Sequence, residues 1–202
     1  MIGGVNTAFV LAGGKSTRMG TDKAFLRWGN ETLLQRMLQL TRSVTSEVCI
    51  VGDATKFCPF APTIEDSFRD QGPLGGIHAA LCSSKSDLNL IVAVDLPFVT
   101  AAFLKYLSDR AQESEAIVIV PRAAERLQPL CAVYRRQFAA VAEESLKRQK
   151  NKIDPLFSMV STRVIEAREM TAAGFSPEMF RNVNTPEDME EAKRVLSLGN
   201  QP

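Results

Sequence analysis

A short apolar run near the start of the chain, residues 7–11, constrains the possible folds more than any other feature of the sequence. Four of its five residues are apolar, and the adjacent glycines Gly13 and Gly14 follow it closely. An apolar run of this length, stopped by glycine and without polar alternation, is typical of a strand that is buried on both faces. Strands of that kind belong to parallel sheets with helices on both sides. We therefore predict a central strand over residues 7–11.

Segments with strand and helix character alternate along the rest of the chain. Residues 31–43 carry apolar side chains at helical spacing, and the apolar run 47–51 predicts the next strand. A strand, a helix and a second strand in this order form a parallel crossover, so we predict an α/β chain. The further predicted elements are a short strand at 62–66, helices over 74–82 and 100–111, strands over 88–94, 116–120 and 129–134, a helix after Arg136, an edge strand at Val164 and Ile165, and a final helix after Pro186.

Length and charge limit the class of protein. With 202 residues the chain is long enough for one sizeable core, and we expect a single domain over residues 1–202. A formal net charge of +1 argues against a broad basic surface for nucleic acid. No apolar segment approaches the roughly 20 residues that span a bilayer, and nothing resembles a secretory leader. We expect a soluble, cytoplasmic protein that binds neither nucleic acid nor membrane.

The four cysteines, Cys49, Cys58, Cys82 and Cys131, are too far apart in the sequence for a metal-binding or redox pair. We expect them to be free thiols in a reducing compartment. Cys49 and Cys131 lie in apolar runs, which favours buried structural cysteines over nucleophiles.

The segment that includes the end of the first predicted strand, residues 10–23, has the composition of a phosphate-binding loop. Gly13 and Gly14 carry no side chain that would keep backbone N–H groups away from an anion. Arg18 offers a planar fork and Lys23 a compact charge, and both can neutralise phosphates. The segment therefore predicts a site for a polyphosphate.

Two better-known phosphate motifs are excluded by their spacing. Gly14, Lys15 and Ser16 imitate the end of a P-loop, but the first glycine of that motif would fall at Phe9. A dinucleotide-binding fingerprint needs glycines at alternate and then third positions, whereas Gly13 and Gly14 are adjacent. The loop belongs to neither class.

A carboxylate, Asp95, follows the apolar strand predicted over residues 88–94. In open α/β sheets, ligands bind outside the carboxyl ends of the strands. Pro97 prevents the strand from continuing regularly, which places Asp95 at the edge of the sheet. A hard cation such as Mg2+ prefers carboxylate and phosphate oxygens, so Asp95 is a candidate metal ligand. The alternative is a turn or cap residue that merely ends the strand.

One long motif indicates a resemblance to a known family. Residues 11–23 match the pattern Leu-Ala-Gly-Gly-x-Ser-x-Arg-Met-Gly-x-Asp-Lys at every specified position. The chain resembles the molybdenum cofactor guanylyltransferases (MobA family), which transfer GMP from GTP to molybdopterin. Later segments of that family have counterparts here in the same order: Asp66 in Ile-Glu-Asp-Ser, the turn Gly-Pro-Leu-Gly-Gly at 72–76, Asp-Leu-Pro-Phe at 95–98 and Asn-Val-Asn-Thr-Pro at 182–186. Residues 135–180 match less distinctively.

The resemblance implies a three-layer Rossmann-like nucleotidyltransferase fold, with a mostly parallel central sheet and helices on both faces. It implies a GTP-binding half over residues 1–100 and an acceptor-binding half over 101–198. GTP and molybdopterin would be the substrates, Mg2+ the cofactor and pyrophosphate the second product. The implied site residues are Arg18, Lys23 and Asp95 for catalysis, Asp95 as the metal ligand, and Leu11, Ala12, Gly13, Gly14, Lys23, Asp66, Gly75, Asp95 and Asn182 for binding.

Most of the implied binding residues have a structural alternative. Asp66 could bind guanine, because a carboxylate accepts from both of its N–H donors, or be an exposed turn acid. Gly75 could let a helix begin close to the nucleotide or serve packing alone. Asn182 matches the acceptor-side position of the family, whereas Asn184 is also suited to capping the final helix. Lys15 falls at a free position of the motif and is auxiliary.

Other polar positions are weaker candidates. The single histidine, His78, is not needed as a general base, because an attacking phosphate is already ionised near neutrality, so we expect a packing or surface role. Gly52 falls where some family members carry an Asn that contacts the nucleotide, and backbone groups or Asp53 would have to replace that contact. The arginines that could meet the pterin phosphate, or simply face solvent, are Arg122, Arg126, Arg135 and Arg136.

Two other functions stay open from the sequence. A related transferase could use CTP, with a molybdenum cofactor or another phosphorylated acceptor, because the glycine loop alone does not select the base. A non-catalytic carrier of nucleotide or cofactor is the other alternative, and the presence of Arg18, Lys23 and Asp95 argues against it. For the transferase we also expect transient contact with cofactor-supplying proteins or target molybdoenzymes.

Overall fold

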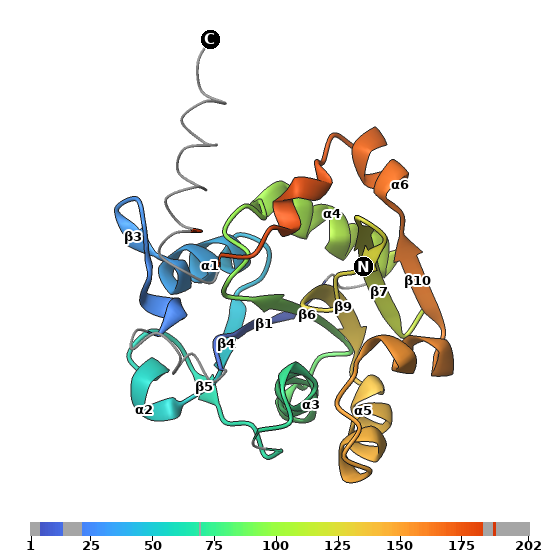
Figure 1. The fold of residues 1–202 in the computed structure, drawn as a ribbon, viewed down its shortest axis with the longest axis horizontal. Helices are drawn as coiled ribbons and strands as arrows, with labels where there is room; N and C mark the ends of the chain where they lie inside the picture. Colours follow the sequence, from blue (N-terminus) through green and yellow to red (C-terminus); the bar gives the residue numbers. More distant parts are fainter. Residues whose placement is uncertain (1–4, 14–21, 69, 184–187, 189–202) are drawn as a thin grey trace.

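A mostly parallel, eight-stranded sheet forms the centre of the fold (Figure 1). The computed structural model describes residues 5–13, 22–68, 70–183 and 188. The strand order is β10-β7-β9-β6-β1-β4-β5, and β8 pairs with β7 outside this path. The strands are β1 (Thr7–Leu11), β4 (Glu47–Val51), β5 (Thr63–Ile64), β6 (Leu88–Ala93), β7 (Val118–Ala123), β8 (Arg126–Leu127), β9 (Cys131–Arg135) and β10 (Thr162–Ile165). Along the path only β9 is antiparallel to its neighbours.

Helices cover both faces of this sheet (Figure 1). One face carries α1 (Leu33–Arg42), α4 (Ala101–Gln112) and α6 (Ala167–Ala172), and the other carries α3 (Pro73–Ser83) and α5 (Phe138–Lys147). The remaining helices of the described residues are α2 (Ala54–Phe57) and the 3-10 helices η2 (Lys23–Phe25), η3 (Asp154–Met159) and η4 (Pro177–Phe180). This arrangement confirms the predicted three-layer α/β fold. In the part of the chain that the structure describes, no helix combines the length and apolar character needed to cross a membrane.

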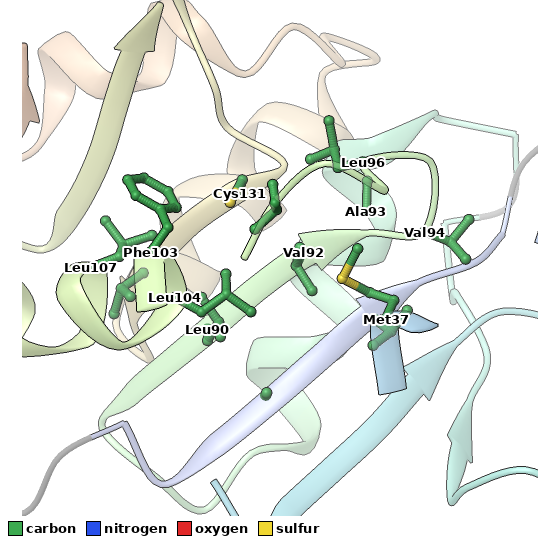
Figure 2. Packing of buried hydrophobic residues seen from close by; sticks show 14 of the residues in the cluster. Met37, Leu90, Val92, Ala93, Val94, Leu96, Phe103, Leu104, Leu107 and Cys131 are labelled. Atoms are coloured by element: carbon green, nitrogen blue, oxygen red, sulfur yellow. The ribbon is translucent and has the colours of Figure 1, made fainter. Parts of the chain in front are cut away.

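Side chains of the central strands alternate between two apolar clusters, one under each helical layer. In β1, Ala8 and Val10 belong to the cluster beneath α1 and α4, whereas Phe9 and Leu11 belong to the cluster beneath α3 and α5. Figure 2 shows part of the first cluster, including Met37, Leu90, Val92, Phe103, Leu104, Leu107 and Cys131. Because β1 is buried on both faces and lies between β6 and β4, the prediction of a central strand over residues 7–11 is confirmed.

The first long helix begins two residues later than its apolar spacing indicated. Thr32 caps α1: its hydroxyl accepts from the Gln35 amide at 3.2 Å, and the Gln35 side chain accepts from the Thr32 amide at 2.9 Å. The preceding residues pair instead in a small hairpin of β2 (Arg27–Trp28) and β3 (Glu31–Thr32), which no sequence pattern predicted. A reciprocal cap of this kind satisfies two backbone donors that the first turn leaves free.

The elements predicted after residue 115 agree with the structure in part. The strand predicted over 116–120 forms as β7, which continues through Pro121 and pairs with β8 across a turn at Ala124 and Glu125. The predicted edge strand at Val164 and Ile165 is confirmed as part of β10. The predicted final helix lies outside the described residues, apart from Asp188, which is helical.

All four cysteines are free, as expected. Cys131 is fully buried in β9, and burial raises the pKa of its thiol to about 12. Cys49 is only partly buried, and Cys58 and Cys82 are exposed. The prediction of a buried structural cysteine is confirmed for Cys131. Cys49, in β4 close to the edge of the sheet, is not fully buried, but burial and the charge of Glu47 raise the pKa of its thiol, so it is not an activated nucleophile.

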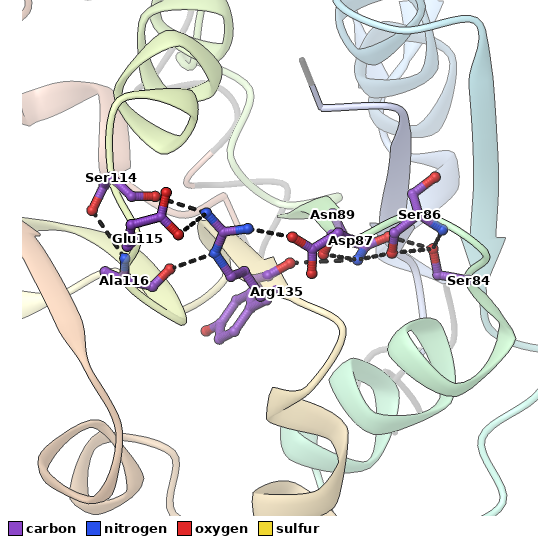
Figure 3. Close-up of polar contacts among 9 residues, drawn as sticks. Ser84, Ser86, Asp87, Asn89, Ser114, Glu115, Ala116 and Arg135 are labelled. Atoms are coloured by element: carbon purple, nitrogen blue, oxygen red, sulfur yellow. Dashed lines mark hydrogen bonds and ion pairs between the residues drawn. The ribbon is translucent and has the colours of Figure 1, made fainter. Parts of the chain in front are cut away.

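Arg135, at the end of β9, ties separate segments together (Figure 3). Its Nε donates to the Ala116 carbonyl at 3.1 Å, its Nη2 donates to the Ser114 carbonyl at 2.8 Å, and its Nη1 pairs with the Asp87 carboxylate. The side chain is only 14% exposed. Arg135 therefore neither faces solvent nor is free to bind an acceptor phosphate, so both interpretations of this residue from the sequence are wrong.

Replacing Arg135 with Met should destabilise the protein. The substitution leaves the two carbonyls without their donor, which we expect to lower the free energy of unfolding by about 1–3 kcal/mol. Urea denaturation of Arg135→Met and of the matched variant Arg136→Met, whose side chain is exposed, measures the difference. Equal midpoints for the two variants would contradict this structural role.

Candidate active site

The carboxyl ends of three neighbouring parallel strands form one edge of the sheet. Leu11, the last residue of β1, is in register with Val51 at the end of β4 and with Ala93 at the end of β6. The pairing continues beyond β6, where the Val94 amide donates to the Leu11 carbonyl at 3.1 Å. Because ligands of such sheets bind beyond the carboxyl ends of the strands, the residues that come after β1, β4 and β6 surround one candidate site.

Asp95 lies at this edge, two residues after the end of β6. Its backbone is held from a distant part of the chain, because the Val183 amide donates to the Asp95 carbonyl at 2.9 Å. Its side chain is 9% exposed, and Oδ2 accepts a hydrogen bond from Lys23 Nζ at 2.5 Å. The structure therefore brings together the predicted metal ligand and one of the two predicted phosphate-binding cations.

Lys23 begins the short helix η2 directly after the predicted phosphate loop. The Asp22 carboxylate caps this helix by accepting from the Ala24 amide at 3.1 Å, and Ala24 is completely buried. The backbone at Lys23 is thus fixed, while its side chain is 24% exposed. The other predicted loop residues, Gly14, Lys15 and Arg18, lie outside the described residues.

The backbone amides at the end of β1 are occupied by protein partners. Ala12 and Gly13 both donate to the Val51 carbonyl, at 3.0 and 3.1 Å. The Gly13 amide is therefore not free to face an anion in this structure, and Gly14, the other glycine of that expectation, lies outside the described residues. Any nucleotide contact of Leu11, Ala12 and Gly13 has to come through other atoms, and their role in binding stays a prediction.

Asp66 lies against the first turn of α3. Its Oδ1 accepts from the Phe68 amide at 2.7 Å, and a Cβ placed on Gly75 would lie 2.8 Å from that oxygen. A side chain at Gly75 would therefore clash with the Asp66 carboxyl group, which occupies that space. Burial raises the pKa of Asp66, although the Phe68 amide and the charge of His78 oppose the shift.

The same turn of α3 packs on the strand ends. A Cβ on Gly76 would be in ordinary contact with the Leu11 and Val51 side chains, at 3.5 and 3.6 Å. Gly72, which precedes the helix, has a φ of 69°, a conformation that glycine adopts without strain. The glycines of the 72–76 turn thus let α3 begin at this edge of the sheet and place Asp66 beside the site.

Gly52, which comes directly after β4, cannot be replaced by a larger residue without rearrangement. A Cβ at this position would lie 2.8 Å from the Phe57 ring and 3.3 Å from the Gly13 amide nitrogen. The neighbouring Asp53 caps α2, with its carboxylate accepting from the Thr55 amide at 2.9 Å and from the Thr55 hydroxyl at 2.6 Å. These hydrogen bonds lower the pKa of Asp53. Asp53 therefore uses one carboxylate oxygen as a helix cap, and whether it replaces an Asn contact to the base stays a prediction.

His78 has the packing role that we expected. It is 8% exposed, and its ring meets the Phe68 ring edge to face with centroids 5.0 Å apart. Its Nε2 lies 3.3 Å from the Cys82 sulfur, one turn along α3. A histidine enclosed in this way is not placed to remove a proton from a substrate.

The predicted acceptor-side residues separate into two groups. Asn182 is exposed and directly precedes Val183, whose amide binds Asp95, so it lies at the candidate site. Arg122 and Arg126 belong to the β7–β8 hairpin, which extends from the carboxyl end of β7, the same edge of the sheet. Arg122 also pairs with Glu166 at 3.3 Å.

Arg136 belongs to the opposite edge of the sheet. It comes after β9, which is antiparallel to β6, and the last residue of β9, Arg135, is in register with Leu88 at the start of β6. Asp95 lies beyond the other end of that strand. Arg135 and Arg136 therefore do not meet an acceptor phosphate at this site, and Arg136, which is exposed, has the solvent-facing role that was the alternative.

Arg36 supports the site and was missed from the sequence. From α1 its Nε donates to the Pro97 carbonyl at 2.6 Å, in the segment just after Asp95. Its guanidinium lies over the Trp28 ring, 5.5 Å from the centroid, and Trp28 meets Phe98 edge to face at 5.2 Å. No sequence pattern links Arg36 to Pro97, because the two residues are 61 positions apart.

Two cavities in the described part of the chain are lined by none of the predicted site residues. One of about 540 Å³ lies between α1 and Phe60, and one of about 680 Å³ lies between α5 and η3. Residues 14–21 of the predicted phosphate-binding segment 10–23 lie outside the described ranges. We therefore define the candidate site by its polar side chains and not by a cavity.

Asp95 has the chemistry of a magnesium ligand that is shared with a substrate. Within the described ranges, no cluster of three or more His, Cys, Asp or Glu side chains could hold a metal ion by itself. Mg2+ is commonly bound by one or two carboxylates together with substrate phosphates. A single buried carboxylate that already holds a cationic group, at the edge where a nucleotide would bind, fits that arrangement.

Comparison with known proteins identifies the family. Residues 8–161 match the MobA-like NTP transferase domain. The chain belongs to this family. A MobA-like relative from Pelotomaculum thermopropionicum, named "Probable molybdenum cofactor guanylyltransferase", is 34% identical over 189 residues, covering 93% of this chain and 91% of the relative. One from Syntrophotalea carbinolica, named "Molybdenum cofactor guanylyltransferase", is 32% identical over 192 residues, covering 93% and 90%.

Solved structures support the MobA-like fold. Molybdopterin-guanine dinucleotide biosynthesis protein A from Archaeoglobus fulgidus superposes with a TM-score of 0.81 at 23% identity, covering 95% of this chain and 99% of that chain. A 2-C-methyl-D-erythritol 4-phosphate cytidylyltransferase from Thermus thermophilus gives a TM-score of 0.68 at 16% identity, covering 94% and 98%. Membership of the MobA-like family makes this protein a nucleotidyltransferase.

The raised pKa of Asp66 predicts how replacing this residue changes the stability of the protein with pH. A raised pKa means that the folded protein keeps the proton over a pH range where the unfolded chain has lost it, so stability falls as pH rises through that range. Asp66→Asn removes this cost. We expect the variant to be at least as stable as the wild type near about pH 7, with the advantage disappearing towards about pH 4.

Thermal unfolding over this pH range measures the effect, and Asp53→Asn serves as the control of opposite sign. Because the pKa of Asp53 is lowered, its ionised form favours folding, and its replacement should cost stability near neutrality and nothing in acid. An Asp66→Asn variant that is less stable than the wild type at neutral pH and equal to it in acid would contradict the assignment for Asp66.

Proposed function

We propose that this nucleotidyltransferase transfers GMP from GTP to the phosphate of molybdopterin, with Mg2+ as the cofactor. The observation that carries the proposal is the pairing of Lys23 with the buried carboxylate of Asp95 at the carboxyl edge of the sheet, the edge at which Asp66 also lies after β5. The names of the MobA-like relatives support the choice of GMP and of the molybdenum cofactor as acceptor. The protein would act in the cytoplasm, in transient contact with a protein that supplies molybdopterin or with a molybdoenzyme that receives the product.

Guanine binding is assigned to Asp66. One oxygen of its carboxylate already accepts from the Phe68 amide, which fixes the orientation of the group at the start of α3. A carboxylate has acceptor positions to spare and can take both N–H donors of guanine. Cytosine offers an amino group beside acceptors rather than two adjacent donors, so this group favours GTP over CTP.

The charges of the triphosphate are assigned to Lys23 and Arg18. The backbone of Lys23 is fixed by the cap of η2. Arg18 lies five residues earlier in the sequence, at the arginine position of the family motif. Asp95 would hold Mg2+, which when bound supplies positive charge to the phosphates of the nucleotide. Preorganised positive charge around the transferring group is the main catalytic resource for this class of reaction.

The reaction needs no general base. A phosphate oxygen of molybdopterin forms a bond to the α-phosphorus of GTP, and the bond from that phosphorus to the bridging oxygen of the β-phosphate breaks. The electron pair leaves with pyrophosphate, and no proton has to be removed from the attacking phosphate, because it is already ionised. Asn182, exposed beside Asp95, would contact the acceptor, and Arg122 and Arg126 at the same edge would offset its charge.

Incubation of the purified chain with molybdopterin, Mg2+ and GTP, CTP, ATP or UTP, followed by mass analysis of the product, tests the proposal. We expect a GMP adduct and pyrophosphate release from GTP alone. Asp95→Asn should lower turnover at least about 100-fold, while Asp109→Asn, which removes an exposed surface carboxylate, should leave it unchanged. A CMP adduct would replace the assignment by that of a cytidylyltransferase, and no adduct with any nucleotide would overturn it.

A further inference from the structure

Lys23 and Asp95 form an ion pair with each other, whereas the proposed function assigns Asp95 to Mg2+ and Lys23 to the triphosphate. Among the ion pairs of the described residues, this one contains the most buried carboxylate, at 9% exposure, and its N–O distance is 2.5 Å. A carboxylate removed from water to this extent needs a cationic partner, because an unpaired buried charge is strongly destabilising. Lys23 is that partner.

The ammonium group of Lys23 occupies the place of a metal ion. Mg2+ binds oxygen at about 2.0–2.1 Å, so it cannot share Oδ2 with an ammonium nitrogen at 2.5 Å. A divalent ion on the other oxygen of the same carboxylate would lie within a few ångströms of the ammonium, where like charges repel. Metal binding at Asp95 is therefore opposed for as long as the Lys23 ammonium stays on Oδ2.

The surrounding structure lets the Lys23 side chain leave without moving its backbone. The Asp22 cap holds the start of η2, the Leu26 amide donates to the Lys23 carbonyl at 3.1 Å, and Ala24 is completely buried. Asp95 is equally fixed by its bond to Val183. A flexible stem with rotatable donors is a property of lysine, so rotation of this one side chain is sufficient.

We propose that Lys23 is an internal competitor of the metal: it closes the Asp95 site in the free enzyme and moves to the triphosphate when nucleotide and Mg2+ bind together. This inference rests on the proposed function for the identity of the ligand that receives Lys23. It assigns to Lys23 a second role, that of a determinant of metal affinity. By linkage, a triphosphate that binds Lys23 increases the affinity of Asp95 for the metal, and a metal bound to Asp95 increases the affinity of Lys23 for the triphosphate.

Metal binding without nucleotide tests the inference directly, with Mn2+ as the probe. Free Mn2+ is measured by electron paramagnetic resonance during titration of the full chain and of Lys23→Met, Lys23→Gln, Asp95→Asn and Lys56→Met. We expect both Lys23 variants to bind Mn2+ between about 5-fold and about 150-fold more tightly than the wild type, the usual range for coupling between two sites. Asp95→Asn should abolish the gain when it is combined with Lys23→Met.

Lys56→Met is the matched control. Lys56 is another cation close in space to this segment, and its ion pairs in the described part of the chain are with Asp22 at 3.4 Å and Asp53 at 3.9 Å. Its replacement should leave Mn2+ affinity at the wild-type value. Lys23→Gln keeps an N–H donor for Asp95, which protects the fold if Lys23→Met is unstable. Thermal unfolding provides a second readout, since Mn2+ should stabilise the Lys23 variants more than the wild type.

Unchanged or weaker Mn2+ binding in folded Lys23 variants would overturn the inference. An equal gain in Lys56→Met would also overturn it, because the effect would then be one of general charge. These outcomes are distinct from failure of the proposed function, since the titration contains neither GTP nor molybdopterin. An enzyme that makes no GMP adduct can still show the gain, and one that makes the adduct can lack it.

Discussion

The candidate site depends on the shared register of β1, β4 and β6. These parallel strands end at the same level, with Leu11 opposite both Val51 and Ala93. Backbone hydrogen bonds just past the strand ends extend this frame, since Ala12 and Gly13 donate to Val51 and Val94 donates to Leu11. The side chains that perform chemistry are attached to it. The Gly13 amide, which we expected to face an anion, is one of the groups that hold this frame together.

The sequence was sufficient for the layers and for the residues at the strand ends. Apolar runs located β1 and β4 at their observed bounds, because four of the five residues of each strand are apolar. Helix caps and very short strands, which do not follow the spacing of apolar residues, were harder to predict. Thr32 and Gln35 cap each other, so α1 begins at Leu33 rather than at residue 31. The strands β2 and β3 have two residues each, too few to show an alternating apolar pattern.

Long-range contacts account for the remaining differences. Lys23 and Asp95 are 72 positions apart, and Arg36 and Pro97 are 61 positions apart, so no local pattern could pair them. Arg135 looked like a free cation because its partners come from two other loops. Gly75 was singled out with nucleotide binding and packing as alternatives, and the packing reason, the Asp66 carboxyl group in the space of its side chain, appears only in three dimensions.

The central claim is that Asp66 binds the guanine of a nucleotide held at this edge, and a comparison of GTP with ITP, which lacks the 2-amino group, tests it most directly. Calorimetric affinities of both nucleotides are measured for the wild type and for Asp66→Ala. We expect the wild type to favour GTP by about 1–3 kcal/mol, the cost of an unpaired buried acceptor, and the variant to lose that preference. A GTP preference that persists unchanged in Asp66→Ala would contradict the claim.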